Sequence, residues 1–442
     1  MTEHVVVVGG GFTGLAAARA LSRQGLKVTV LESSPALGGL AAGFPICGTR
    51  LEKAYHYILT GDTDLLALIR DLGLGSELLQ RAGSVGIFDG VRIHPFTTAL
   101  DVLRFAPLRL VDRLRLGLAM VHLQRTRNWR PLAAQTARDW LTGACGPGAM
   151  RAIWNPLLQG KFDRHWDQVS MAWLWARIHT RANSRRRGRE WLGYVRGGFG
   201  KIIRALETEL RAAGVVLHIS ARVERLEMDQ QPGAGRQLHL SDGTTLNFDR
   251  LLFTGPSGAF ARLLPADPAL DAYRQQLDAI DYLGAICLVF ASTQCLTEQH
   301  WLNIHDPEAP FLVLVNHTRL VGTELYAGKH IYYLGCYRPP ESPWFQMDDA
   351  TLAQQWLAYL KKINPDFDPE AISEHHVFRF SHAQHVVTCD HERRVPGFRT
   401  PLPGVYLANF SQIFPEDRGT NFAIRDGLKV ASIIIEDSLA HI

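Results

Sequence analysis

The sequence predicts an α/β fold in which a parallel-sheet domain is assembled from separate segments and a second, α+β domain is inserted between them. Three observations lead to this prediction. A strand–helix–strand unit opens the chain of 442 residues, and a buried strand followed by a helix closes it. The residues between them do not continue the alternation of strand and helix. Such alternation is the pattern of parallel sheets covered by helices.

The opening unit is the clearest of these elements. Residues 5–8 are four consecutive valines, which is typical of a strand buried on both faces. Residues 12–24 have helical periodicity and are rich in Ala and Leu, and Gly25 ends that helix. Residues 27–31 then read as a second strand. The unit therefore predicts two neighbouring parallel strands joined by a right-handed crossover.

The remaining elements follow with less regular spacing. Helical patterns occupy residues 62–73, 95–130, 135–181 and 421–440, and the third of these is dense in tryptophan. Strand-like runs occupy residues 251–256, 285–292, 311–317, 331–337 and 404–410. We expect residues 1–90, 190–275 and 385–442 to form the first domain, and residues 91–189 and 276–384 to form the second.

A glycine motif joins the first strand to the first helix. It reads Gly9-Gly10-Gly11-Phe12-Thr13-Gly14. The first glycine permits a tight turn, the second lets a pyrophosphate approach the backbone, and the third lets helix and strand pack closely. The N-terminus of the helix offers free N–H groups and a positive dipole to phosphates. The motif predicts a Rossmann-type dinucleotide site.

Glu32 ends the second strand, where its carboxylate can accept hydrogen bonds from a ribose diol. The same carboxylate would repel a 2′-phosphate. These residues predict an adenine dinucleotide without a 2′-phosphate, and both NAD and FAD satisfy that description. A second strand–GxGxxG–helix unit does not occur, which argues against a separate NAD(P)H domain.

A second pair of glycines, Gly38-Gly39, follows in "SSPALGGLAAGF" and brings bare backbone to the bound dinucleotide. With this pair the chain resembles the flavin amine oxidase superfamily, which includes protoporphyrinogen oxidases and phytoene desaturases. It looks most like the bacterial protoporphyrinogen-oxidase-like proteins. The resemblance implies FAD as the cofactor. It also implies a Rossmann-type FAD-binding domain with a substrate domain, in the amine-oxidase or glutathione-reductase-2 arrangement.

Residues 404–431 resemble the C-terminal flavin motif of the superfamily, and residues 219–227 resemble the strand that holds adenine. Four residues depart from the usual pattern: Ser34, Leu40, Asn409 and Phe422. The resemblance implies that FAD is bound by Gly9, Gly11, Phe12, Thr13, Gly14, Glu32, Ser33, Gly38, Gly39, Leu40, Val223, Asn409, Asn421, Phe422 and Ala423.

Three residues are candidates for the chemistry, each with an alternative interpretation. His56, in the "LEKAYH" segment that should lead to the flavin, could contact flavin or substrate or move a proton, or could be structural. Lys161 could hold an anionic group or act as a base, or could lie on the surface. Arg418, just before the last helix, could stabilise reduced flavin or bind substrate. We expect no metal site, since His382 and His385 lack a carboxylate partner.

We expect an FAD-dependent oxidoreductase that removes hydride from a C–C or C–N bond of a largely apolar substrate, of the protoporphyrinogen oxidase, desaturase or amine oxidase type. Three alternatives stay open. One is a flavin mutase resembling UDP-galactopyranose mutase, and another is a reductase running the reaction backwards. The third is a non-enzymatic binding protein on the same fold. The sequence leaves the electron acceptor and the oligomeric state open.

Composition limits the partners. Charged residues make up 20% of the chain and the formal net charge is +4, which does not point to nucleic acid. The six cysteines lack metal-site spacing, and no apolar run is long enough to span a bilayer. We expect a cytoplasmic protein with a small-molecule partner. Residues 104–130 contain Leu, Val and Met together with a row of arginines. This pattern predicts either an ordinary packed helix pair or peripheral contact with the inner membrane face.

Overall fold

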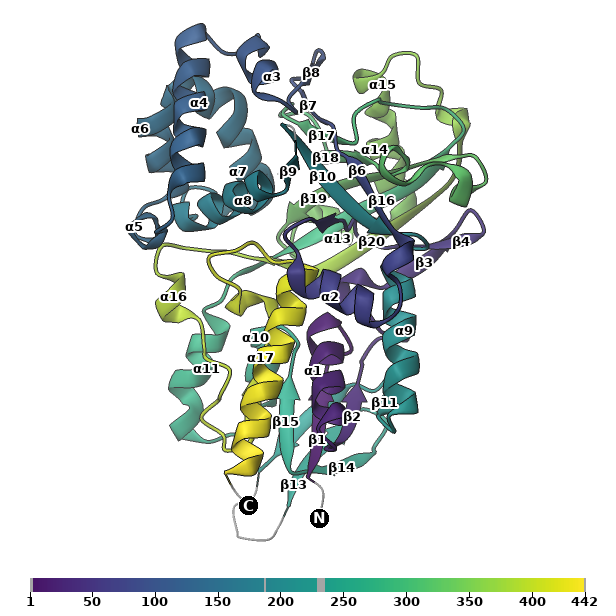
Figure 1. The fold of residues 1–442 in the computed structure, drawn as a ribbon, viewed down its shortest axis with the longest axis vertical. Helices are drawn as coiled ribbons and strands as arrows, with labels where there is room; N and C mark the ends of the chain where they lie inside the picture. Colours follow the sequence, from purple (N-terminus) through teal and green to yellow (C-terminus); the bar gives the residue numbers. More distant parts are fainter. Residues whose placement is uncertain (1–2, 187, 229–234, 441–442) are drawn as a thin grey trace.

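The computed structural model describes residues 3–186, 188–228 and 235–440. A parallel five-stranded sheet forms the lower half of the molecule in Figure 1, in the order β11-β2-β1-β15-β21. Its strands are β1 (His4–Val8), β2 (Lys27–Leu31), β11 (Val216–His218), β15 (Arg250–Phe253) and β21 (Val405–Leu407). Because these strands come from three distant parts of the chain, the prediction of a discontinuous parallel-sheet domain is confirmed.

Helices cover one face of this sheet. Helix α1 (Phe12–Arg23) and helix α17 (Thr420–Leu439) lie side by side there (Figure 1). Gly427 permits their contact, because a Cβ at this position would overlap the Thr13 carbonyl oxygen. Helices α2 (Thr63–Asp71) and α9 (Phe199–Ala212) border the pair. The two ends of the chain are therefore joined through a helix–helix contact as well as through the sheet.

The opposite face is covered by a small antiparallel sheet and by two helices. The sheet contains β12 (Val223–Glu227), β13 (Arg236–Leu240) and β14 (Thr245–Phe248), and the helices are α10 (Ser257–Leu263) and α11 (Asp271–Asp278). Val6 of the central strand packs in one buried cluster with Leu226 and Leu238 of the small sheet. Val5, Val6 and Val7 are fully buried, as expected for a strand with both faces covered.

A mixed seven-stranded sheet in the order β20-β16-β19-β18-β17-β7-β8 lies in the upper half of the molecule, to the right of the α4 label in Figure 1. Its strands are β7 (Val85–Phe88), β8 (Ile93–Pro95), β16 (Tyr282–Ser292), β17 (Trp301–Ile304), β18 (Val313–Asn316), β19 (His330–Arg338) and β20 (Ile372–His385). Neighbours are antiparallel except β7 and β17. The predicted division at residue 90 stays a prediction, and β7, which precedes it, pairs within this sheet.

Helices α14 (Asp349–Ala358) and α15 (Leu360–Ile363) cover one face of this second sheet with a buried cluster around Trp356. Shorter strands connect the two halves. They are β3 (Gly43–Ile46), β4 (Thr49–Glu52), β5 (Ile58–Leu59), β6 (Leu78–Ala82), β9 (Arg185–Arg186) and β10 (Arg189–Val195). Strand β10 pairs with both β5 and β6, so the segments before and after the helical insertion are tied together.

A helical group stands at the upper left of Figure 1. It contains α3 (Ala99–Arg104), α4 (Leu110–Arg125), α5 (Arg130–Ala133), α6 (Ala137–Ala149), α7 (Asn155–Phe162) and α8 (Met171–Asn183). Trp154, Trp173 and Trp175 are buried in its core, so these tryptophans hold the helices together. No helix among the described residues is long and apolar enough to cross a membrane.

Candidate active site

The first glycine motif forms a bare turn between β1 and α1. Gly9 has a φ of 114°, and a Cβ at Gly14 would overlap the Gly9 carbonyl oxygen. Gly11 is the residue before α1, and no side chain caps this helix. The first backbone amides of α1 therefore stay available to an anion. Phe12, the first residue of the helix, packs edge-on against Phe199 with ring centroids 6.2 Å apart, and Thr13 meets α17.

Glu32 lies against this turn. The Gly10 amide donates a 2.8 Å hydrogen bond to Oε2 of Glu32, and the Ser34 amide donates one of 2.7 Å to Oε1. The Ser33 hydroxyl lies 3.4 Å from Oε1. The amide of Ala221 donates to the Glu32 carbonyl, which brings the segment leading to Val223 to the same strand end. The acid and the adenine-strand segment therefore meet at the carboxyl end of β2.

The second glycine pair faces the first motif. Gly38 and Gly39 have φ values of 117° and 55°, a region that favours glycine. A Cβ at Gly39 would lie 3.4 Å from the Gly11 Cα, so the two glycine segments approach each other without side chains between them. Leu40, the next residue, lines an internal cavity.

That cavity, of about 300 Å³, lies between the parallel-sheet half, the second sheet and the helical group. Its walls come from residues 54–62, from α7 and α8, from β16, β17, β18, β19 and β20, and from the start of α17. The strand wall is mostly apolar. Its lining includes Ala285, Cys287, Val313, Val315, Leu334, Tyr337, Phe380 and Ala383. The helical wall carries Lys161, Arg177 and Arg181.

His56 lines the cavity beside α9, with its ring centroid 5.2 Å from that of Phe199. Its Nδ1 lies 2.8 Å from the Ala54 carbonyl oxygen, so Nδ1 carries the proton and donates. Burial lowers the pKa of His56 to about 4, because a charged ring would lose its hydration there. The ring is therefore neutral near pH 7, and Nε2 is free to accept a hydrogen bond.

Nearby Glu52 holds the glycine-rich segment that leads into α9. Its Oε1 accepts from the Phe199 amide at 2.5 Å and its Oε2 accepts from the Tyr194 hydroxyl at 2.6 Å. Burial raises the pKa of Glu52 to about 6, although these hydrogen bonds act against the rise. Glu52 therefore positions α9, which packs against α1.

Lys161 is buried in the helical wall and forms an ion pair with Asp417. Its Nζ lies 3.1 Å from Oδ2 of Asp417, and Arg177 donates to the same oxygen at 2.5 Å. The indole N–H of Trp173 donates to Oδ1 at 3.0 Å. The pKa of Lys161 is lowered to about 7, chiefly by burial; the charges of Arg177 and Arg418 act in the same direction, and Asp417 acts against them.

Asp417 stays ionised in this cluster. Burial by itself would raise its pKa, but the charges of Lys161, Arg177 and Arg418 outweigh burial and hold the pKa below its usual range. Sequence reasoning missed both Asp417 and Arg177. The neighbouring letters "EDR" and the spacing of Arg177 and Arg181 on one helix face were the available signals.

Arg418 lines the cavity immediately before α17. Its NH2 group donates a 2.8 Å hydrogen bond to the Tyr337 hydroxyl, and its guanidinium lies 5.7 Å from the centroid of that ring. Its Nε is buried without a hydrogen-bond partner. His56, Lys161 and Arg418 thus come together around one cavity from three distant segments. Their catalytic roles stay predictions.

The C-terminal residues of the predicted cofactor set also have internal contacts. Oδ1 of Asn421 accepts from the amides of Asp64 and Leu65 at 2.9 and 3.1 Å, which caps the start of α2. Asn409 is buried, and its amide donates to the Gly255 carbonyl at 3.0 Å and to the Ser257 hydroxyl at 3.1 Å. Asn421 and Phe422 line the cavity, and Ala423 follows them in the first turn of α17.

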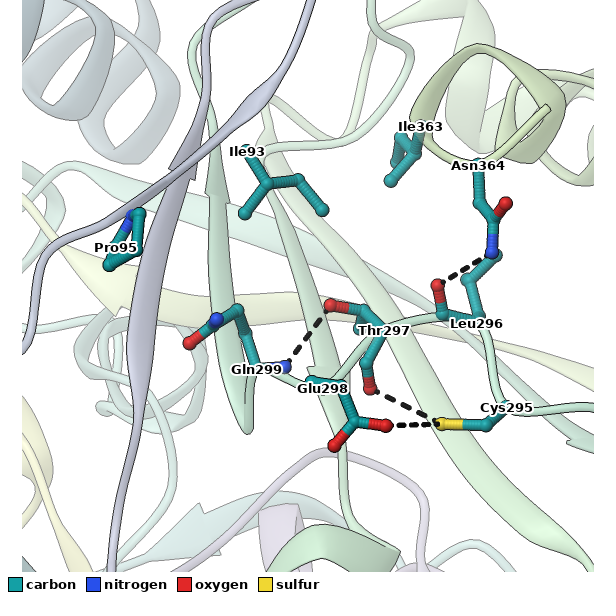
Figure 2. Close-up of a pocket in the computed structure, with 9 residues that line it drawn as sticks. All are labelled: Ile93, Pro95, Cys295, Leu296, Thr297, Glu298, Gln299, Ile363 and Asn364. Atoms are coloured by element: carbon teal, nitrogen blue, oxygen red, sulfur yellow. Dashed lines mark hydrogen bonds between the residues drawn. The ribbon is translucent and has the colours of Figure 1, made fainter. Parts of the chain in front are cut away.

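A second hollow of about 430 Å³ opens elsewhere, at the β8 end of the second sheet (Figure 2). Its lining residues are Ile93, Pro95, Cys295, Leu296, Thr297, Glu298, Gln299, Ile363 and Asn364. Figure 2 shows the Cys295 sulfur directed toward Glu298 and the Thr297 carbonyl, at 3.8 and 3.5 Å. None of the predicted site residues lines it. Among the described residues, no group of three His, Cys, Asp or Glu side chains could hold a metal ion.

Comparisons with known proteins agree with this geometry. The profile of the family described as flavin containing amine oxidoreductase matches residues 12–435. A coproporphyrinogen III oxidase from Propionibacterium freudenreichii is 26% identical over 324 residues, covering 60% of this chain and 59% of that protein. A carotenoid phi-ring synthase from Streptomyces griseus is 24% identical, covering 91% and 82%. The first similarity thus spans under two thirds of that relative's length.

Among solved structures, a protein from Exiguobacterium sp. 255-15, provisionally named a protoporphyrinogen oxidase, superposes with a TM-score of 0.77. The match covers 99% of both chains at 20% sequence identity, which shows a shared fold. Both the predicted fold class and the predicted resemblance are thereby confirmed.

The glycine cradle fits the cofactor of this family, FAD. The uncapped amides of α1 suit a pyrophosphate. A Cβ at Gly14 or Gly38 would collide with neighbouring protein atoms, so glycine at these positions lets the two segments pack closely and present bare backbone to the pyrophosphate. The Glu32 carboxylate suits a ribose diol. Because the family profile covers nearly the whole chain and the cradle suits its cofactor, this protein belongs to the flavin containing amine oxidoreductase family, whose members are FAD-dependent oxidoreductases.

Proposed function

We propose that this protein removes hydride from a C–C or C–N bond of a largely apolar substrate that binds in the cavity of about 300 Å³. The observation that carries the proposal is the position of the cavity. It is bounded by an apolar strand wall and by the start of α17, beside the glycine segments that suit FAD. Bound FAD supplies the hydride acceptor for such a reaction.

The chain's own residues would orient the substrate and hold protons. The strand wall excludes water from the apolar body of the substrate, which strengthens the electrostatic interactions inside the cavity. Neutral His56 offers Nε2 as an acceptor for a substrate proton. Lys161, with a pKa near 7, could hold or release a proton at Nζ close to physiological pH.

The test is anaerobic reduction of the bound flavin. The purified protein is mixed without oxygen with a porphyrinogen, a carotenoid precursor or an amine, because the family and the relatives' names point to these substrate classes. We expect one class to bleach the visible flavin spectrum, and an added electron acceptor to restore it. Turnover without net consumption of an acceptor would instead support a mutase. A protein that binds flavin but has no such activity would support a binding role.

We propose further that the helical group binds the surface of an anionic membrane. Helix α4 buries Leu116, Ala119 and Leu123 against the molecule, yet large apolar side chains also line its outer face. The exposed apolar residues on α3 and α4 are Leu100, Leu103, Leu110, Val111, Leu114, Leu118 and Val121, which we call the α3–α4 stripe. Arg104, Arg109 and Arg125 are exposed around it, which matches the charge of anionic lipids.

Cosedimentation with vesicles tests the membrane proposal. We expect binding to vesicles that contain phosphatidylglycerol, weaker binding to pure phosphatidylcholine, and loss of binding in the variant Leu114→Gln/Leu118→Gln. Leu428→Gln, at an exposed leucine of α17, is the matched control and should bind normally. Equal sedimentation of the stripe variant and the control, or a dimer that the stripe variant abolishes, would overturn the proposal.

A further inference from the structure

The two walls of the cavity differ in charge. Its helical wall carries three basic side chains, Lys161 on α7 and Arg177 and Arg181 one turn apart on α8. The strand wall opposite is mostly apolar, and Arg418 stands between the two walls at the start of α17. A substrate in this space therefore meets apolar side chains on one side and positive charge on the other.

The carboxylates at the helical wall are already engaged. Oδ2 of Asp417 accepts from both Lys161 and Arg177, and its Oδ1 accepts from the Trp173 indole. Nε of Arg181 lies 3.5 Å from Oε1 of Glu190, and Nη2 of Arg181 donates a 2.9 Å hydrogen bond to the Tyr57 hydroxyl. Asp417 thus serves two cations and has no oxygen left without a donor.

Arg418 is the cavity cation that makes no direct ion pair in the described part of the chain, although Asp417 attracts it from nearby. Within the described residues it makes no ion pair with a carboxylate at 4.0 Å or less, and its Nη2 donates a hydrogen bond to the neutral Tyr337 hydroxyl. Its Nε is buried and unpartnered. A partly buried guanidinium beside an apolar wall is costly when the carboxylate of Asp417 is shared with two other basic groups, because burial removes its hydration and only part of a counter-charge replaces it. An anion in the cavity would supply the rest of that charge.

We propose that the substrate of this protein carries a carboxylate, which binds to Arg418 beside the Lys161–Asp417–Arg177 cluster while the apolar body of the substrate lies on the strand wall. This inference rests on the proposed function only in taking the cavity as the substrate site. It selects among the substrate classes of that proposal. A cationic amine would be repelled by Arg418 and Arg177, and an uncharged hydrocarbon would leave Arg418 unpaired.

Three ligands of one chain length test the inference: decanoate, decylamine and decan-1-ol. Each is titrated into the flavin-loaded protein, and binding is followed by the change in flavin absorbance and in tryptophan fluorescence, since Trp301 lines the cavity. We expect decanoate to bind at least about tenfold more tightly than decan-1-ol, the range of one charge-assisted hydrogen bond, and decylamine to bind most weakly. Equal affinity for decanoate and decan-1-ol, or a preference for decylamine, would overturn the inference.

Variants at Arg418 test whether this residue causes the preference for decanoate. Arg418→Gln should remove most of the advantage of decanoate over decan-1-ol, and Arg418→Lys should retain part of it. Arg204→Gln, at an exposed arginine of α9, is the matched control and should leave the ratio unchanged. If Arg418→Gln lowered flavin occupancy but left the ligand ratio unchanged, the arginine would serve the flavin and the inference would be wrong.

The outcome is separable from that of the proposed function. Ligand preference is read from binding, whereas hydride removal is read from anaerobic bleaching. A protein that selects decanoate through Arg418 but is reduced by no candidate substrate would support the carboxylate site and contradict the proposed reaction.

Discussion

The glycine cradle and the substrate cavity are built in opposite ways. The cradle consists of backbone from short contiguous segments, with Gly9, Gly14 and Gly38 placed where a side chain would collide. The cavity consists of side chains from segments hundreds of residues apart, and its charged cluster joins Lys161 to Asp417 across 256 positions of sequence. A site made of backbone tolerates little added side-chain volume. A site made of buried charged side chains is destabilised when one charge is removed.

The largest expected effect is on the charged cluster. Asp417→Asn leaves Lys161 and Arg177 without their counter-charge in a buried setting, so we expect a loss of about 3–5 kcal/mol in the free energy of unfolding. Urea denaturation measures it. Glu341→Gln, which breaks an exposed ion pair with Arg164, should cost at most about 1 kcal/mol. Equal costs for the two variants would show that the cluster is not coupled to folding.

The next effect depends on pH. Burial lowers the pKa of His300, whose Nε2 lies 2.9 Å from the hydroxyl of the cavity-lining Tyr55, from 6.5 to about 4. Between these values the unfolded chain takes up a proton and the folded chain does not, so the free energy of unfolding falls as the pH drops from about 6.5 to 4. We expect His300→Asn to remove at most about 3 kcal/mol of this fall, since one pKa unit is worth about 1.4 kcal/mol.

Denaturation curves at several pH values measure the effect of His300→Asn. The control is His218→Asn, at an exposed histidine of β11, which should leave the pH dependence unchanged. If the His300 variant and the wild-type protein lost stability in parallel below pH 6.5, burial of this ring would not be the cause.

A larger side chain in the glycine cradle should lower both stability and flavin content. In Gly14→Ala the new methyl group meets the Gly9 carbonyl oxygen, so we expect a cost of about 1–3 kcal/mol and loss of most bound flavin. The ratio of visible to ultraviolet absorbance reports flavin content. Gly117→Ala, in α4 where a Cβ meets nothing within 4 Å, should keep its flavin and gain up to about 1 kcal/mol. Full flavin content in both variants would contradict a tight backbone cradle.

The smallest expected effect on stability comes from Asn421, which joins the start of α17 to α2. Asn421 caps α2 from the start of α17, so Asn421→Ala should cost about 1 kcal/mol and lower the melting temperature. Thr98→Ala removes the cap of the peripheral helix α3 at a similar cost. We expect the Asn421 variant, but not the Thr98 variant, to bind flavin more weakly, and identical flavin affinity would show that this cap acts only on stability.

Much of the cradle could be read from short stretches of sequence. The valine run of β1, the spacing of Gly9, Gly11 and Gly14, and the position of Glu32 are local features, and a local feature determines a local structure. The C-terminal segment was recognised only through resemblance. The cap that Asn421 provides to α2 was not predicted, because it joins residues 357 positions apart and no periodicity reports such a contact.

The sequence alone therefore determined the parallel sheet, the glycine turns and the acid at the end of β2, since each follows from neighbouring residues and their backbone preferences. Only the tertiary structure decided which charges share the cavity. It brought Asp417 into direct ion pairs with Lys161 and Arg177 and left Arg418, among the described residues, without a direct ion pair. The physical reason is that burial and charge pairing depend on distance in space, which the order of residues along the chain does not contain.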